Sequence, residues 1–446
     1  MSKATFNFPK NFKWGTATAA HQVEGGNTNN QWHIWEQTPG HIANNDKSGL
    51  ACDWWNNAEA DFDRMVEINQ NAHRLSIEWS RIEPREGVYD TAAIDRYRQM
   101  LLGLRQRGIE PMVTLHHFTN PIWLEEQSAW ENADLVVPKF ERFAEKAAQS
   151  FGDLCDFWCT INEPNIYGVM CYLSGGRMPP GKEDMPLALR VMQNMMLGHA
   201  AAYHALHRVQ PMARVGFAHH IRPMQPASRR NPLDGIAAKI VDGMFNWSLF
   251  NVIQTGKWDR LMGRGAPSAK ALKGTLDWVG VNYYTRQFIK FQHQNNGSFF
   301  AEVSGHPEGA VISDFNYGEI YPQGFLIALR KTAQLGVPIY ITENGLPDEA
   351  DAMRPAFLAE HVRQIWLAAN FNWNIAGYYH WSLVDNFEWG EGWRMKFGLY
   401  AVDHITQTRA LRKSGRLYGE ISKANALSAE MVQEYAPELM EKMFPD

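Results

Sequence analysis

The sequence is poor in cysteine and has no large excess of charge of one sign. Its 446 residues include only four cysteines, and the formal net charge is −5 at pH 7. With no Cys-x-x-Cys pair, buried free thiols are the expectation rather than disulfides or a metal site. The slightly negative charge provides no basic field for nucleic acid or an anionic membrane, so we predict neither as a partner. The cysteines are Cys52, Cys155, Cys159 and Cys171.

Long hydrophobic runs are also missing. No apolar stretch approaches the roughly 18 residues of a membrane span. Residues 1–12 lack the apolar run of about 7–15 residues that a signal peptide needs. We therefore expect a cytoplasmic protein without a membrane segment. Hydrophobic residues make up 45% and charged residues 20%, which is typical of a globular chain rather than a disordered one.

The chain instead shows a regular alternation of short apolar runs and longer helical patterns. A helical face is clear, for example, where Ile94, Tyr97, Leu101 and Leu104 recur at helical spacing. Eight strands separated by helices predict a closed (β/α)₈ TIM barrel that forms a single domain over residues 1–446. The eight strand-like runs are 12–18, 72–79, 109–117, 155–163, 214–219, 276–284, 337–343 and 375–381.

The length beyond a minimal barrel is assigned to loops and a tail. A TIM barrel needs about 250 residues. The largest surplus segments, 24–51, 167–186 and 286–321, all follow strand ends, so we expect them to wall the catalytic face. Residues 421–446 fall outside the alternation, and we predict a C-terminal helical extension of one or two short helices that braces the barrel.

Functional side chains gather where the predicted strands end. In a TIM barrel the active site lies at the C-terminal ends of the strands. The residues found there are rich in carboxylates, hydrogen-bonding groups and aromatic rings, without an obvious metal set or phosphate cradle. They are Arg74, His117, Asn162, Glu163, Asn282, Tyr284, Glu343 and Trp381.

Two glutamates stand out in this set. Pro164 cannot donate to a sheet ladder, so its strand must end with Glu163 at the edge. Glu343 is followed by Asn344-Gly345, which has turn chemistry. Two carboxyl groups that flank one bond are what glycoside hydrolysis requires: one protonates the leaving oxygen, and the other attacks the anomeric carbon or activates water.

The neighbours of the two glutamates suggest which role each takes. Arg74 and Tyr284 favour the charged form of Glu343, which we predict to be the nucleophile. Glu163 lies beside Trp158 and the neutral amide of Asn162. We expect its pKa to rise there, which suits the acid/base role.

The motifs around these glutamates resemble those of a known family. Thr160-Ile161-Asn162-Glu163-Pro164 and Ile341-Thr342-Glu343-Asn344-Gly345 resemble the two signatures of the family-one glycoside hydrolases, the retaining β-glucosidase family. The similarity runs from about residue 8 to residue 418. It implies a β-glucosidase with β-galactosidase and β-fucosidase activity beside it. Such an enzyme hydrolyses terminal β-linked sugars through a covalent glycosyl-enzyme intermediate, without cofactor or metal. Its substrates would be small β-glycosides or oligosaccharides, as in cellulose degradation.

The resemblance also implies a set of site residues. Gln22 lies in the family's opening segment, and 381–389 matches a motif that binds the far hydroxyls of the sugar. Segment 392–398 departs from the family's more basic, Ser-containing version, which leaves the leaving-group preference open. The predicted catalytic residues are Glu163, Glu343, Arg74, Asn282 and Tyr284. The predicted substrate-binding residues are Gln22, His117, Asn162, Trp381, Glu388, Trp389 and Phe397.

Several other interpretations compete with these. Arg74 could form a structural ion pair with Glu78, and His117 could be a core histidine. The doublet His219-His220 could suggest zinc, but adjacent strand residues point to opposite faces and cannot chelate together. A phosphosugar hydrolase on the same fold is disfavoured because Glu388 would repel a phosphate. A non-catalytic carbohydrate-binding or scaffold protein would require the loss of a catalytic carboxylate, and both are present.

Overall fold

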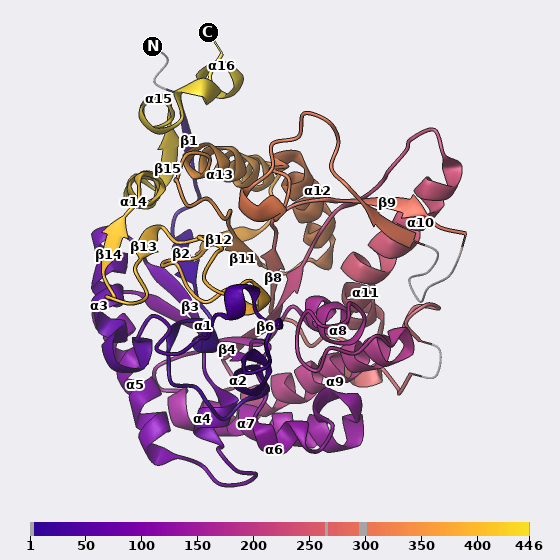
Figure 1. Cartoon of the computed structure of the whole chain (residues 1–446). Coiled ribbons are helices and arrows are strands. Elements are labelled where there is room, and N and C mark those ends of the chain that lie inside the picture. Colours follow the sequence, from indigo (N-terminus) through magenta and orange to yellow (C-terminus); the bar gives the residue numbers. More distant parts are fainter. Residues whose placement is uncertain (1–3, 264–265, 294–300, 446) are drawn as a thin grey trace.

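The computed structural model describes residues 4–263, 266–293 and 301–445. Eight parallel strands close into a barrel in the order β11-β12-β2-β3-β4-β5-β6-β8, which confirms the predicted fold (Figure 1). Each predicted run contains or overlaps one barrel strand. The strands are β2 (Lys13–Ala17), β3 (Ala72–Ser76), β4 (Glu110–His116), β5 (Phe157–Asn162), β6 (Arg214–His220), β8 (Trp278–Asn282), β11 (Ile339–Asn344) and β12 (Ile375–Trp381).

The barrel strands read as almost continuous apolar runs because both of their faces are covered. One face packs inside the barrel and the other against the surrounding helices, so β5 and β11 are buried along their whole length. Figure 1 shows the strands around the centre, with α3, α5, α7, α9 and α13 outside them. The larger helices are α3 (Trp54–Glu67), α5 (Thr91–Gln106), α7 (Ala133–Phe151), α8 (Pro164–Tyr172), α9 (Met185–Val209), α10 (Pro232–Asp242), α11 (Ser248–Thr255), α12 (Pro322–Thr332), α13 (Arg354–Asn370) and α14 (Lys413–Ala424).

Side chains fix the starts of several helices. The Asp90 carboxylate accepts hydrogen bonds from the backbone N–H groups of Ala92 and Ala93 at the start of α5. Asp184 accepts from Leu187 at the start of α9. Each satisfies backbone donors that have no partner inside the helix, which typically contributes about 1 kcal/mol. The shorter helices are α1 (Ala20–Val23), α2 (Gln31–Glu36), α4 (Trp79–Ile82), α6 (Ile122–Glu125), α15 (Ala429–Tyr435) and α16 (Met440–Met443).

The three predicted insertions differ in structure. Segment 24–51 contains α2 and irregular turns, and 167–186 contains the end of α8 and the loop to α9. The described part of 286–321 contributes β9 and β10 to a sheet of order β10-β9-β7 beside the barrel. The strands outside the barrel are β1 (Thr5–Asn7), β7 (Met224–Pro226), β9 (Gln287–Phe291), β10 (Ala301–Ser304), β13 (Tyr400–Val402), β14 (Arg409–Leu411) and β15 (Ala426–Ser428).

The C-terminal region is more than the helical extension that the sequence suggested. The predicted boundary at residue 421 falls inside α14, and β15 pairs antiparallel with β1 near the start of the chain. Phe444 stacks on Phe6 with 4.8 Å between ring centroids. The two termini therefore lie side by side (Figure 1).

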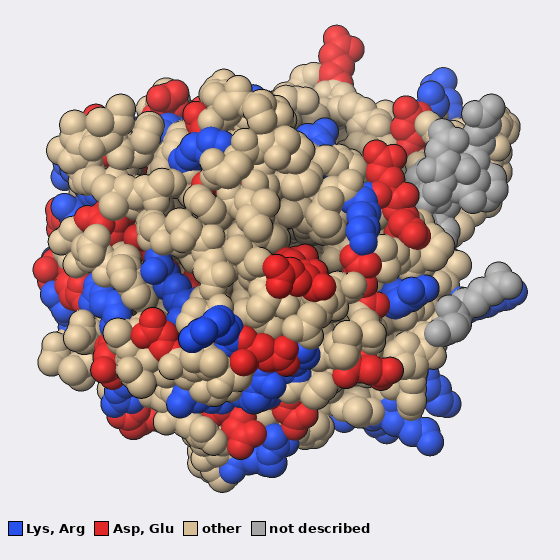
Figure 2. Space-filling model, turned by 60° about the horizontal axis from the view of Figure 1, so that its bottom comes forward, with Lys and Arg blue, Asp and Glu red and all other residues tan. Residues whose placement is uncertain are grey.

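The state of the cysteines and the distribution of surface charge agree with what the composition predicts. All four cysteines are buried and free, as expected. Within the described ranges, no helix combines the length and apolarity needed to cross a membrane. Figure 2 shows acidic and basic side chains interspersed on one face, rather than a continuous field of one sign.

Candidate active site

A pocket of about 590 Å³ opens at the C-terminal ends of the barrel strands. Of the predicted site residues, Glu163, Glu343, Tyr284, His117, Asn162, Trp381, Glu388 and Trp389 line it. The other four stand directly behind this lining, and each contacts one of its members. Arg74 contacts Glu343, Asn282 contacts Glu163, Gln22 contacts Glu388, and Phe397 packs on Tyr284.

Glu343 lies at the end of β11 between a cation and a hydroxyl. Arg74 Nη1 donates to Glu343 Oε1 at 2.6 Å, and the Tyr284 hydroxyl donates to Oε2 at 2.8 Å. The Arg74 and Glu343 side chains are 1% and 5% exposed, so this ion pair is almost free of solvent screening. Both contacts hold the carboxylate in one orientation and favour its charged form.

Arg74 does not pair with Glu78, so that interpretation is wrong. Its other contacts include the Asn162 side-chain oxygen at 2.6 Å and the Thr114 hydroxyl at 3.0 Å. The strand β3 ends at Ser76, so Glu78 lies two residues beyond the strand and does not point into the barrel. Glu78 precedes α4 and accepts hydrogen bonds from neutral donors instead. These donors are Asn27, Asn30, Ser80 and Thr119.

Glu163 is positioned by a sharp change in chain direction. β5 ends at Asn162, Glu163 has a left-handed backbone conformation with φ of 47°, and α8 starts at Pro164. Glu163 Oε1 accepts a hydrogen bond from Asn282 Nδ2 at 2.8 Å and lies 2.9 Å from His220 Nδ1. Asn282 is held in turn by the Thr342 hydroxyl, which donates to its side-chain oxygen at 2.6 Å.

The neighbours of Glu163 differ from the sequence-based expectation. Trp158 donates its indole N–H to Gln210 rather than to the Glu163 carboxyl group. Burial raises the pKa of Glu163, but the combined effects of His220, Asn282 and Arg74 outweigh it, so the net shift is downward. Burial and then the negative charge of Glu163 raise the pKa of Glu343 to about 7 against the opposing effect of Arg74. The expectation of a raised pKa at Glu163 is therefore wrong.

The two carboxyl groups nevertheless titrate as a pair. Because the two carboxyl groups interact, the pKa of about 7 belongs to the pair and corresponds to the loss of its last proton. Burial also lowers the pKa of His220, which leaves the imidazole neutral near neutral pH and weakens its pull on Glu163. With one proton shared between them, the two groups can act together as an acid and a nucleophile.

Polar groups in and directly behind the pocket lining suit sugar hydroxyls. Gln22 Nε2 donates to Glu388 Oε2 at 3.1 Å, and Gln22 Oε1 is buried without a partner among the described residues. Asn162 Nδ2 lies 3.1 Å from His117 Nε2, and burial holds the pKa of His117 well below its usual value. The neutral ring therefore accepts from Asn162, which leaves its buried, unpartnered Nδ1–H to donate to a ligand.

Aromatic rings form the apolar side of the same region. The rings of Trp381 and Trp389 lie 5.9 and 6.0 Å from His117, both close to parallel with it. Phe397 is buried and packs edge-on against Tyr284 and Tyr317. Phe397 thus contacts the pocket wall through Tyr284, and its role in binding substrate stays a prediction.

Sequence reasoning missed several polar residues of the pocket. His220, Arg222 and Tyr317 all line it. The predicted run 214–219 stopped one residue short of His220, the last residue of β6 and thus a strand-end residue like the others. The doublet does split as expected, since His219 Nε2 contacts the Asn246 carbonyl oxygen and His220 contacts Glu163. Within the part of the chain that the structure describes, no group of three or more metal-ligating side chains occurs.

Known proteins that are similar to this chain match nearly its whole length. A 1,4-beta-D-glucan glucohydrolase from Thermotoga neapolitana is 30% identical and covers 94% of this chain and 99% of its own. A beta-galactosidase from Saccharolobus solfataricus is also 30% identical, with 96% and 97% coverage. The solved structure of a beta-glycosidase from Pyrococcus horikoshii has a TM-score of 0.89, 34% identity, and 97% and 98% coverage.

A solved family 1 b-glucosidase from Thermotoga maritima, in complex with isofagomine lactam, gives a TM-score of 0.90 at 29% identity, with 95% and 100% coverage. The sequence model of glycosyl hydrolase family 1 matches residues 4–427. This match spans the barrel, both glutamate motifs and segment 381–389. The chain therefore belongs to glycosyl hydrolase family 1.

Proposed function

We propose that this protein is an exo-acting β-glycosidase that removes one terminal β-linked sugar with net retention. Retention is general for the family to which the chain belongs. The observation that carries the proposal is the pairing of two buried carboxyl groups with different partners in one pocket: Glu343 with Arg74 and Tyr284, and Glu163 with Asn282 and His220. The exo mode is proposed because Trp381, Glu388 and Trp389, which match the family's sugar-binding motif, line the same pocket.

In the first step Glu343 Oε2 or Oε1 forms a bond to the anomeric carbon as the bond to the leaving oxygen breaks. Glu163 gives its proton to that oxygen, so the aglycone departs as a neutral alcohol. Arg74 and Tyr284 hold the attacking carboxylate, and Asn162, itself fixed by Arg74, is available to the sugar beside it. The site is preorganised because each of these groups is already hydrogen-bonded.

In the second step Glu163 is a carboxylate and takes a proton from water. The water oxygen attacks the anomeric carbon, and the ester bond to Glu343 breaks. Asn282 and His220 orient the carboxylate for both steps. Two inversions at one carbon give the β-sugar as product.

The substrate range is also part of this proposal. The names of the relatives include glucohydrolase, glucosidase and galactosidase, which supports small β-glucosides and β-galactosides as substrates. Gln22, His117 and Glu388 provide the acceptors and donors for their hydroxyls. A role in cellulose degradation and a cytoplasmic location stay predictions.

Hydrolysis of an aryl β-glucoside, followed by NMR of the first-formed anomer, tests the proposal. We expect β-glucose first and a loss of at least about a thousandfold in kcat/KM for Glu343→Gln. Glu78→Gln is the matched control because Glu78 is equally buried and its pKa is raised to about 7, but it lies outside the pocket. An α-product from the wild type, or equal activity losses in the two variants, would contradict the proposal.

A further inference from the structure

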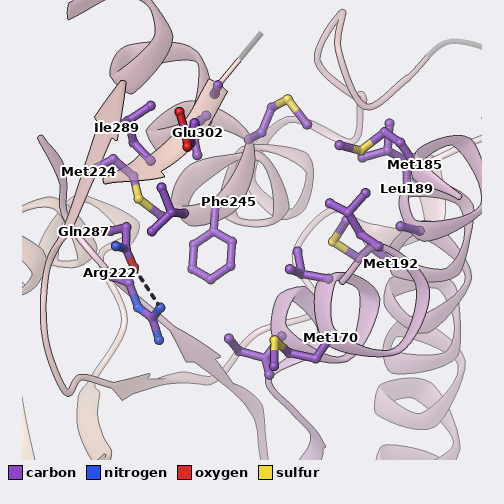
Figure 3. A pocket seen from close by; sticks show the side chains of 18 residues that line it. Met170, Met185, Leu189, Met192, Arg222, Met224, Phe245, Gln287, Ile289 and Glu302 are labelled. Atoms are coloured by element: carbon purple, nitrogen blue, oxygen red, sulfur yellow. Dashed lines mark hydrogen bonds between the residues drawn. The ribbon is translucent and has the colours of Figure 1, made fainter. Parts of the chain in front are cut away.

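A second cavity, of about 330 Å³, adjoins the catalytic pocket. Figure 3 shows side chains of α8 and α9 on one side of it and those of the β10-β9-β7 sheet on the other, with Phe245 between them. Ile166, Met170 and Arg222 line both the cavity and the catalytic pocket, so they form the boundary between the two. We call this cavity the methionine chamber.

The lining of the methionine chamber is chemically unlike that of the catalytic pocket. Apart from Arg222, Gln287 and Glu302, every residue that lines it is apolar. Arg222 donates to Gln287 at one wall, and Glu302 is exposed at the rim. The five methionines are flexible and polarizable, so they can adapt to an irregular apolar guest. They are Met170, Met185, Met192, Met224 and Met244.

The position of the chamber relates it to the leaving group. α8 starts directly after Glu163, and its residues Ile166 and Met170 lie at the boundary. Phe245, on a π-helical turn between α10 and α11, packs edge-on against His220, which contacts Glu163. The leaving oxygen receives its proton from Glu163, so the aglycone must lie on this side of the pocket.

We propose that the methionine chamber receives the apolar chain of the aglycone, which makes β-glycosides of aliphatic alcohols the preferred substrates. This inference rests on the proposed glycosidase function. A second sugar placed in the chamber would leave its hydroxyl groups without partners, whereas an alkyl chain would lose only water contacts. The volume lies at the lower end of the roughly 300–1,000 Å³ range of small-molecule sites. The reaction is the hydrolysis already described, with the aliphatic alcohol as the neutral leaving group.

A chain-length series of n-alkyl β-glucosides from methyl to octyl, used below micelle-forming concentrations, tests this proposal. The leaving oxygens of the longer members have nearly equal basicity, so changes in kcat/KM report binding of the chain. We expect kcat/KM to rise by up to about fourfold per methylene and then level off when the chamber is filled. A flat series would overturn the inference.

Two half-buried leucines of α9 provide a matched pair of variants. Leu189 lines the chamber and Leu187 does not. Leu189→Gln places a polar group in the path of the chain, and the octyl-to-methyl ratio of kcat/KM should fall at least about fivefold. Leu187→Gln should leave this ratio unchanged. Leu189→Trp fills the chamber and should move the plateau to a shorter chain. Equal ratios in all three variants would place the chain elsewhere.

The series also separates this inference from the function on which it rests. An aryl β-glucoside is assayed beside the alkyl compounds as a substrate that does not depend on an aliphatic chain. If the aryl glucoside is hydrolysed while the alkyl series is flat, only the chamber proposal fails. If neither is hydrolysed, the glycosidase function fails and the chamber proposal falls with it.

Discussion

Replacing His220 with phenylalanine isolates the contact that the sequence did not reveal. The change removes the Nδ1 partner 2.9 Å from Glu163 Oε1 and keeps a ring that can stack on Tyr284, whose centroid lies 5.8 Å away. Both partners of the lost contact are nearly solvent-free, at 4% and 7% exposure. A hydrogen bond to a charged group contributes about 1.5–3 kcal/mol.

This energy is needed when Glu163 becomes a carboxylate in the transition state. Losing it should slow substrates with poor leaving groups, such as alkyl β-glucosides, by about 10- to 100-fold in kcat/KM. A dinitrophenyl leaving group departs without a proton, so its first step should be almost unaffected. Because the ionised form of Glu163 loses a donor, the pair keeps its last proton to higher pH. The basic limb of the pH profile should therefore move upward.

Steady-state kcat/KM values, measured on the alkyl and the dinitrophenyl substrate across a range of pH, test this prediction. His219→Phe is the control because His219 precedes His220 but contacts the Asn246 carbonyl on the other side of the strand. His220→Gln retains an amide donor and should recover part of the loss. Equal slowing of the alkyl and dinitrophenyl substrates by His220→Phe would refute the argument, since it would show general damage to the site rather than a weaker acid.

Two further predictions concern charge in the pocket. Glu388→Ala should lower kcat/KM for glucosides and galactosides by about 5- to 150-fold, because sugar hydroxyls lose a buried partner. Fucosides lack the 6-hydroxyl, so their kcat/KM should fall less. Equal losses for all three substrates would contradict a hydroxyl-binding role. In the wild type, the last proton of the Glu163–Glu343 pair is lost near pH 7, so kcat/KM should fall as the pH rises above about 7. A profile that stays level to pH 9 would contradict this assignment.

Barrel topology explains why the place of the site was predictable. Parallel strands end at one rim, so Glu163 and Glu343 had to come together once eight strands were recognised. Asn344-Gly345 was interpreted as a turn, but the structure adds a steric reason for the glycine. A Cβ on Gly345 would collide with the Trp381 carbonyl oxygen. This close approach joins the end of β11 to the end of β12, and no local pattern reveals it.

The partners within the site were less predictable than its position. An alternating pattern shows which residues face inward but does not fix where a strand ends. β3 ends at Ser76, two residues before Glu78. Glu78 therefore contacts neutral donors, and Arg74 contacts Glu343 instead. β6 extends to His220, one residue beyond the predicted run, so His220 lies at the strand end with the other site residues. These errors concern only one or two residues at a strand end, but they change which charged groups contact the two catalytic carboxyl groups.

The helix α8 couples the acid to the leaving group more directly than the strands do. Glu163 immediately precedes the helix, and Ile166 and Met170, within its next two turns, lie at the boundary of the methionine chamber. A chain bound in the chamber therefore contacts the same rigid element that positions the proton donor. Alignment of the leaving oxygen with Glu163 and burial of the chain are then two results of one docking event. For this reason the chain-length effect is expected in kcat/KM, which measures the transition state of glycosyl transfer, and not only in ground-state binding.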